Sequence, residues 1–377
     1  MGIGPQADSH LYGDEDSHTL KHVCEKARPH LPHLTRLGLG CIDHLEGVPA
    51  VAHPRAGYGK MQEASAGKDS TTGHWELAGI RTDKAFPTYP DGFPEDVIAR
   101  FIAATGARGV LGNKAASGTA IIDELGAEHQ RTGLPIVYTS ADSVFQIAAH
   151  KDTIPLEELY RMCEVSREKV CVGSHAVGRV IARPFVGEPS AYSRISSERK
   201  DYALKPPAET VQEALQSAGI RTIAIGKIGE LFDGVGFDEI RKTKSNEEGI
   251  RETLSAMSGA VEPTFIWVNL VDFDQEFGHR NDVAGFARSL EAFDHTVPDF
   301  LTALPSGGRL VITADHGNDP TTPSTDHSRE FVPLLVCGGE PGRDLGLRSS
   351  FLDHAASVAA FFGAPFDIDG QPFEGMS

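Results

Sequence analysis

The sequence predicts an α/β fold in which helices cover a sheet. Short apolar runs rich in β-branched residues end abruptly at polar or glycine-containing turns, and they alternate with longer segments that carry apolar residues at helical spacing. Runs of four to eight such residues are typical of strands that are buried on both faces. The alternation of the two kinds of segment indicates a sheet covered by helices.

The expected strands lie at residues 134–139, 222–225, 264–271, 309–313 and 332–336. Residues 209–218 predict a helix, because their apolar side chains have helical spacing and Gly219 follows as a C-terminal stop. Proline and glycine cluster at residues 86–94 and again, with polar residues, at 184–207. We interpret both clusters as hinges. Residues 1–86 and 205–377 are therefore expected to form a discontinuous core, with residues 87–204 as an inserted second domain.

Length and charge limit the class of protein. A chain of 377 residues allows about two domains. Its 35 Lys and Arg against 53 Asp and Glu give a net charge of −18, which argues against nucleic acid or an anionic membrane as partner. No apolar run approaches the roughly 20 residues needed to cross a bilayer, and residues 1–16 do not resemble a secretory signal. Five scattered cysteines without a Cys-x-x-Cys pair suit reduced thiols, so we expect a cytoplasmic protein.

Polar side chains follow two of the expected strands. Residues 264–271 lead into Asp272, Asp274 and His279 (DFDQEFGH), and residues 309–313 lead into Asp315 and His316, with His327 eleven residues further on. Ligands of open α/β sheets lie beyond the carboxyl ends of strands, so both groups should meet in one crevice.

Carboxylates and imidazoles without thiolates suit manganese, zinc or iron. Asp315 and His316 could face different ions, as in the two-metal sites that transfer phosphoryl groups. The other interpretation of Asp-His-Gly is a simple turn after a strand. One aspartate of the Asp-Phe-Asp sequence should point away from the metal.

A third group of polar residues occupies positions 67–76 (GKDSTTGHWE). One interpretation makes a hydroxyl of this run the nucleophile, bound to a metal that lowers its pKa. The other makes Asp-Ser-Thr-Thr a turn that caps a helix.

With these motifs, the chain resembles the phosphopentomutase family of the alkaline phosphatase superfamily. The resemblance covers nearly the whole chain, through GIGPQADSHLYGDEDSHTL, GKDSTTGHWELAG, GVLGNKAASGTAIIDELG, PIVYTSADSVFQIAAH, GRVIARPF, VNLVDFDQEFGH and ITADHGNDPTTPSTDHSREFVPLLV. It implies a metal-binding core with a large mixed central sheet, an inserted smaller α/β cap domain and two Mn²⁺ ions, with other divalent ions as alternatives. It also implies an isomerase that interconverts ribose 1-phosphate and ribose 5-phosphate, and the 2-deoxyribose pair, through a phosphoenzyme. A sugar bisphosphate activator is a further expectation.

The resemblance also assigns site residues. It implies that Asp274, His279 and His327 hold one metal, and that Asp315 and His316 hold the other together with the oxygen of the nucleophile, Ser70. The residues that it places in contact with the pentose phosphate are Ser140, Asp142, Arg179 and Arg194 in the cap, with Lys227 from near the hinge. Cationic side chains suit a bisphosphate that must be retained while it turns round.

The sequence departs from the family pattern at two places. The family usually has threonine at the position of Ser70; serine keeps the hydroxyl but loses the methyl group that restricts its rotamer, so we expect chemistry to survive with altered positioning. The family also has a buried strand ending in Asp-Ser before the Gly2-Ile3-Gly4 segment, and that aspartate is a metal ligand. Met1 stands directly before Gly2 here, so we expect unpaired strand edges and an uncovered core face.

Two alternatives to the mutase stay open: a metal-dependent phosphatase of the same superfamily, and an inactive sugar-phosphate-binding relic that lacks one metal ligand. The preference between ribose and deoxyribose, the metal and the oligomeric state also stay open.

Overall fold

Two compact units make up the computed structural model, which describes residues 1–140 and 142–375. Unit 1 comprises Met1–Ala85 and Pro206–Ser377, and unit 2 is the intervening segment Phe86–Lys205. Each unit has its own strands and its own apolar core. Among the described residues, no helix is both long enough and apolar enough to cross a membrane.

The strands of unit 1 form two sheets. One has the order β11-β12-β1-β13 and is mixed, since β12 is antiparallel to both neighbours while β13 is parallel to β1. The other has the order β10-β8-β9 and is parallel throughout. The strands are β1 (Gly57–Met61), β8 (Arg221–Ile225), β9 (Glu239–Arg241), β10 (Thr264–Val268), β11 (Leu310–Ile312), β12 (Val332–Cys337) and β13 (Asp344–Arg348).

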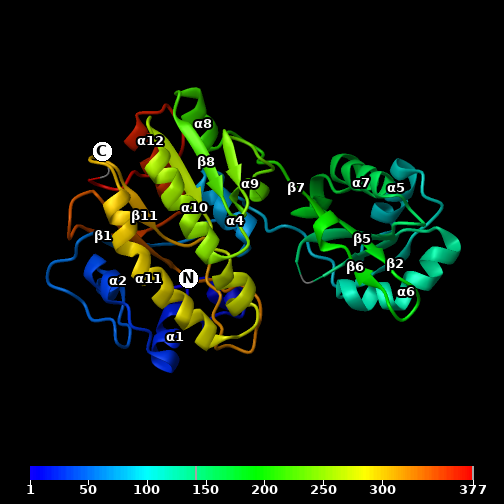
Figure 1. Ribbon diagram of the computed structural model, residues 1–377, viewed down its shortest axis with the longest axis horizontal. Coiled ribbons are helices and arrows are strands. Elements are labelled where there is room, and N and C mark those ends of the chain that lie inside the picture. The colour runs from blue at the N-terminus through cyan, green and yellow to red at the C-terminus, as the bar shows by residue number, and fades with distance from the viewer. Residues whose placement is uncertain (141, 376–377) are drawn as a thin grey trace. The chain divides into compact units, whose positions relative to one another are not determined.

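Helices cover these sheets, as Figure 1 shows. Helices α10 and α11 lie side by side, and α8 packs against α12. The helices of unit 1 are α1 (Thr19–Ala27), α2 (Pro32–Leu37), α3 (Leu39–Ile42), α4 (Ser70–Leu77), α8 (Val211–Ser217), α9 (Ile228–Leu231), α10 (Asn246–Gly259), α11 (Val283–Ala303) and α12 (Leu352–Phe362), with short turns η1 (Ser9–Leu11) and η5 (Phe273–Gly278).

Unit 2 is a smaller α/β unit. Its strands follow the order β2-β3-β4-β5-β6, and β7 also pairs with β5. They are β2 (Leu111–Ala115), β3 (Ile136–Thr139), β4 (Val144–His150), β5 (Arg179–Val186), β6 (Ser193–Arg194) and β7 (Lys200–Ala203). The helical segments are α5 (Glu95–Thr105), α6 (Gly118–Thr132), α7 (Leu156–Val165) and the turns η2 (Ser166–Val170), η3 (Gly173–His175) and η4 (Ser196–Glu198).

The predicted α/β class is confirmed, and each predicted strand has a counterpart in β3, β8, β10, β11 or β12. The predicted helix is α8, which starts with a capping box formed by Thr210 and Glu213 and is followed by Gly219. Burial differs from the expectation in β10 and in β11, where Leu310 and Val311 are only half-buried. Strand β12 is buried throughout, whereas every residue of β10 is only half-buried. The sheet of unit 1 is also divided, because β10 and β11 are not paired with each other.

Candidate active site

The carboxyl ends of β10 and β11 and the start of α4 bring the candidate site residues of unit 1 together. Asp274 lies in η5, just beyond β10, and Asp315 and His316 follow β11. Ser70 is the first residue of α4. Its Oγ lies 3.0 Å from His316 Nε2, so the folded chain joins the hydroxyl run to the Asp-His pair across 246 positions of sequence.

Carboxylate and imidazole groups converge beside this serine. Asp274, His316 and His327 each offer a ligand atom, and these atoms lie within 4.8 Å of one another. His279 Nε2 lies 3.3 Å from Asp274 Oδ2, and Asp315 Oδ2 lies 3.1 Å from His316 Nε2. The five residues predicted as metal ligands are therefore neighbours in the structure.

The donor set fits a divalent metal. His327 Nε2 is buried and lies 3.1 Å from Asp274 Oδ1, yet it makes no hydrogen bond of good geometry within the described part of the chain. A buried ring nitrogen in that state is available as a ligand, and oxygen and nitrogen donors without sulfur suit manganese, zinc or iron. His279 Nδ1 shares a hydrogen bond with the carbonyl oxygen of Thr325, 2.6 Å away, which orients its Nε2 toward Asp274.

Electrostatics at this site favour ionised carboxylates. Burial raises the pKa of Asp274, but the neighbouring imidazoles of His279 and His327 outweigh it and hold that pKa below its usual value. Burial likewise acts to raise the pKa of Asp315, and the charge of nearby imidazoles, first that of His316, lowers it well below normal. Burial lowers the pKa of His316, but the carboxylate of Asp315 reverses the direction and raises it. The carboxylates are therefore in their metal-binding form at neutral pH.

The start of α4 confirms the capping interpretation of the hydroxyl run, through its first residue. Asp69 is the N-cap, and its carboxylate accepts hydrogen bonds from the backbone N–H groups of Thr71 and Thr72 and from the Thr72 hydroxyl. The cap is thus Asp69 and not Ser70. The Ser70 hydroxyl takes no part in this cap and lies beside His316 Nε2, so the two interpretations do not exclude each other.

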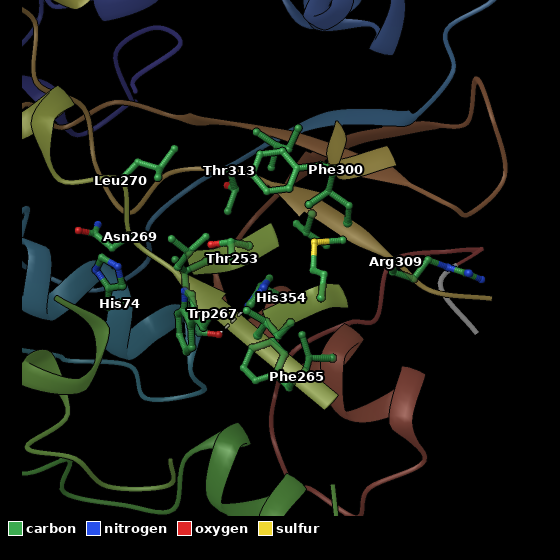
Figure 2. A pocket seen from close by; sticks show the side chains of 18 of the residues that line it. His74, Thr253, Phe265, Trp267, Asn269, Leu270, Phe300, Arg309, Thr313 and His354 are labelled. Atoms are coloured by element: carbon green, nitrogen blue, oxygen red, sulfur yellow. Dashed lines mark hydrogen bonds between the residues drawn. The ribbon is translucent and has the colours of Figure 1, made fainter. Parts of the chain in front are cut away.

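His74 is a neighbour of Ser70 and Asp315 that the sequence analysis did not single out. Its Nδ1 lies 2.8 Å from the carbonyl oxygen of Ser70 and 3.1 Å from Asp315 Oδ2, and its ring stacks on Trp267 at 5.9 Å (Figure 2). It therefore connects α4, which begins at Ser70, to the Asp-His loop. The i, i+4 spacing from Ser70 was the signal, since such residues share a helix face.

Gly73 allows α4 to approach the loop of Asp315 and His316 closely. A Cβ at this position would lie 2.1 Å from the carbonyl oxygen of Asp315.

Asn318, also missed, donates from Nδ2 to Asp274 Oδ1 at 2.9 Å. The other aspartate of the Asp-Phe-Asp sequence, Asp272, accepts a hydrogen bond from the backbone of Asn246, so it points away from the site as predicted.

Arg329 ties the loop that precedes Ser70 to the segment that follows His327. The guanidinium is 3% exposed and donates to Glu63 Oε2, to the carbonyl oxygens of Glu63 and Gly67, and to Asp8. The sequence gives no signal for this network, because its members are scattered along the chain.

The predicted substrate residues of unit 2 are only partly together. Ser140 and Asp142 follow β3, and Arg179 Nη2 lies 3.9 Å from Asp142 Oδ2. The backbone of Arg194 pairs with Phe185 of β5, and its guanidinium lies beside Tyr138 Oη and Gly118, at the amino end of α6. In unit 1, Lys227 precedes α9 and lines the same cavity as Ser70 and Asp274.

The chain is similar to known metalloenzymes over almost its whole length. The family model of the Metalloenzyme superfamily matches residues 1–365. The chain is 53% identical over 364 residues to a phosphopentomutase of Caldanaerobacter subterraneus, covering 96% of this chain and 92% of the relative. It is 49% identical to a phosphopentomutase of Thermotoga maritima, covering 100% and 97%. A solved structure of a Pyrococcus horikoshii protein has a similar fold, with a TM-score of 0.50 at 14% identity over 98% of this chain and 97% of that one.

Proposed function

The chain belongs to the phosphopentomutase family within the metalloenzyme superfamily and is an isomerase, and from this we propose that Ser70 carries the phosphoryl group during the reaction. The proposed substrates are ribose 1-phosphate and ribose 5-phosphate and the corresponding 2-deoxyribose pair. The observation that carries the proposal is the Ser70 hydroxyl, which is not used as a helix cap and lies 3.0 Å from His316.

Two divalent ions, which we propose to be Mn²⁺, fit the donor set. Asp274, His279 and His327 would hold one, and Asp315 and His316 the other. When bound, such ions supply positive charge to a phosphoryl group and lower the pKa of a neighbouring hydroxyl.

The chain's own residues account for the rest of the proposed mechanism. Ser70 Oγ forms a bond to phosphorus as the bond from phosphorus to one oxygen of a bisphosphorylated pentose breaks. This leaves one pentose monophosphate and phospho-Ser70. A monophosphate of the other isomer then binds, and phospho-Ser70 transfers its group to the free hydroxyl of that sugar, which regenerates the bisphosphate and the Ser70 hydroxyl. His74 keeps the first turn of α4 against Asp315 and so positions Ser70.

We assign sugar-phosphate contacts in unit 2 to Ser140, Asp142 and Arg179. An arginine beside an aspartate offers a cation for phosphate and an acceptor for sugar hydroxyls. Arg194, whose guanidinium lies beside Gly118 at the amino end of α6, is a further candidate cation. Lys227 of unit 1 is the remaining candidate cation.

The test is a coupled assay of ribose 1-phosphate conversion, with Ser70→Ala and Ser70→Thr as paired variants. We expect the alanine variant to lose turnover by at least about a thousandfold with an unchanged melting temperature, because a nucleophile is removed but no core group. The threonine variant keeps the hydroxyl and should keep most of the activity. Retained turnover in Ser70→Ala would refute the proposed role.

Metal dependence and product identity complete the test. Removal of metal with EDTA should abolish turnover, and added Mn²⁺ should restore it. Release of inorganic phosphate as fast as isomerisation would instead make the protein a phosphatase. Binding of ribose 5-phosphate without any turnover would make it an inactive relic.

A further inference from the structure

Charged side chains of unit 2 gather on the face of its sheet that carries α6. In Figure 1 this sheet separates α6 from α5 and α7. Along β5, Val180 and Ala182 belong to the core under α5 and α7, while Phe185 packs with α6. Successive side chains of a strand alternate between the two faces, so Arg179 and Arg183 lie on the α6 face together with Phe185.

Strand β7 adds Arg199 and Asp201 to the same face. Asp201 lies opposite Ile181 in the antiparallel pair of β7 with β5, and Ile181 is two residues from Arg179. Asp201 is therefore a diagonal neighbour of Arg179, within reach of a long side chain. Arg199 precedes β7 in an extended conformation, two residues before Asp201, so its side chain has the same direction. The intervening Lys200 points to the opposite face, where its ammonium group lies over a tyrosine ring at 4.7 Å.

The carboxylate of Asp201 joins two of these arginines. Arg199 donates to it from Nε at 2.7 Å and from Nη2, and Arg179 donates to it from Nη1 at 3.4 Å. The side chain of Asp201 is 17% exposed, whereas those of Arg179 and Arg199 are 36% and 37% exposed. The carboxylate is thus mostly covered, and the two guanidinium groups that it joins reach solvent.

Asp201 compensates only part of the positive charge on this face. Arg183 donates from Nε to the side-chain oxygen of Gln146 at 3.0 Å, and this partner is neutral. Burial lowers the pKa of Arg183, the charge of Arg199 lowers it further, and the charge of Asp201 opposes the shift. Cations held this close together repel one another, and an anion bound beside them relieves the repulsion.

The geometry also leaves N–H groups of both arginines pointing away from Asp201. A guanidinium has five N–H groups in a planar fork. Arg199 directs the edge formed by Nε and Nη2 at Asp201, and Arg179 directs Nη1 at it. Arg179 Nη2 is 3.9 Å from Asp142 Oδ2, which is too far for a hydrogen bond. Two adjacent guanidinium groups in this arrangement match the oxygens of a phosphate dianion.

We propose that Asp201 is a positioning residue for phosphate recognition, and that Arg199 is a further residue in contact with the phosphate of the substrate. Asp201 holds Arg179 and Arg199 side by side before the phosphate arrives. A side chain that is already fixed loses less freedom on binding, and the carboxylate offsets the repulsion between the two cations. The proposal rests on the proposed function, because it takes a pentose phosphate as the ligand.

Binding and turnover of ribose 5-phosphate test this role separately. Isothermal titration calorimetry on the Mn²⁺-loaded chain gives the Kd without a need for catalysis, and the coupled assay gives KM and kcat. The variants are Asp201→Asn, Asp201→Glu, Arg199→Gln and the double variant Asp201→Asn with Arg199→Gln. Glu158→Gln is the matched control, because Glu158 belongs to α7 and pairs there with Arg161 at 2.6 Å.

We expect Asp201→Asn and Arg199→Gln each to raise the Kd and the KM about tenfold, because a charge-assisted contact is lost, while kcat and the melting temperature stay close to those of the unaltered protein. Asp201→Glu keeps the carboxylate and should recover most of the affinity, and Glu158→Gln should change none of these quantities. The double variant should cost less affinity than the two single variants added together, since Asp201 acts through Arg199.

An unchanged Kd in Arg199→Gln would overturn the contact, and strictly additive losses in the double variant would overturn the positioning role. A fall of kcat and melting temperature together in Asp201→Asn would make that residue structural, and Arg199→Gln would still decide the contact. If the unaltered protein has no turnover but the tenfold changes in Kd are found, the proposed function fails and this inference stands. If the unaltered protein binds neither ribose 5-phosphate nor inorganic phosphate, both are overturned.

Discussion

Replacement of Arg329 by methionine should remove a large part of the stability of unit 1. The guanidinium is 3% exposed, and its partner Glu63, whose side chain is also 3% exposed, lies 3.1 Å away. Loss of one member of a buried pair leaves the other charge uncompensated, which costs about 3–5 kcal/mol. A whole domain is stable by only about 5–15 kcal/mol. The change therefore weakens the protein severely although no apolar core residue is altered.

The expected loss depends on pH. Burial raises the pKa of Glu63, and the charge of Arg329 opposes that rise. Without Arg329 the pKa in the folded state rises further, while the pKa in the unfolded state stays normal. An acid with a raised folded pKa loses stability as the pH increases through that pKa, so the variant should be more severely destabilised at pH 8 than at pH 5.

Urea unfolding at both pH values measures the effect. Arg251→Met is the matched control, because Arg251 is 62% exposed and its contact with Glu248 at 3.4 Å is a surface pair worth less than about 1 kcal/mol. The double variant Arg329→Met with Glu63→Gln should recover part of the loss, and it keeps the test valid if the single variant does not fold. A cost for Arg329→Met within about 1 kcal/mol of the control, or no recovery in the double variant, would refute the reasoning.

Two further predictions concern the site loop and the amino-terminal segment. Gly73→Ala places a Cβ 2.1 Å from the carbonyl oxygen of Asp315, so α4 must move and turnover should fall at least about tenfold. Gly259→Ala is the control, because a Cβ at that position has nothing within 4 Å, and it should change neither kcat nor the melting temperature. Equal kcat values in the two variants would contradict the close approach. Burial acts to raise the pKa of Asp319, but hydrogen bonds, including one from His22 at 2.6 Å, hold it below normal. The stabilising effect of the ionised Asp319 carboxylate is then complete above about pH 4 and is lost as the pH falls through the pKa of the folded state. Asp319→Asn should therefore have a flatter dependence of melting temperature on pH between about pH 4 and 2. Parallel curves for the two proteins would disprove this.

The strands with strong local patterns could be predicted from the sequence. The run at 332–336 became β12, since a continuous apolar stretch is what burial between covering helices requires. Strand β1 gave no such signal, because its sequence Gly-Tyr-Gly-Lys-Met contains two glycines and a lysine. It is a strand because β12 and β13 pair with it on both sides, which is a property of the fold and not of the segment.

The residues of the candidate site could likewise be predicted only where their signal is local in the sequence. Asp274, Asp315 and His316 were predictable because they directly follow apolar runs, and position at a strand end is a local feature. The contact of His74 with Asp315 and that of Arg329 with Glu63 join residues more than 200 positions apart. No spacing rule relates such residues, so only the folded chain brings them together.

The division of unit 1 into two sequence segments sets an order of folding during synthesis. Unit 2 is one continuous segment, and its core can form once Lys205 has left the ribosome. The main core of unit 1 joins Ile3 and Leu20 to Phe286 and Leu335, so it cannot close until the last of these has been made. At roughly 5–20 residues per second, the wait after Lys205 is on the order of 7–26 seconds. For that interval the amino-terminal segment exposes apolar side chains without their partners, which makes it the part of the nascent chain that most needs chaperone protection.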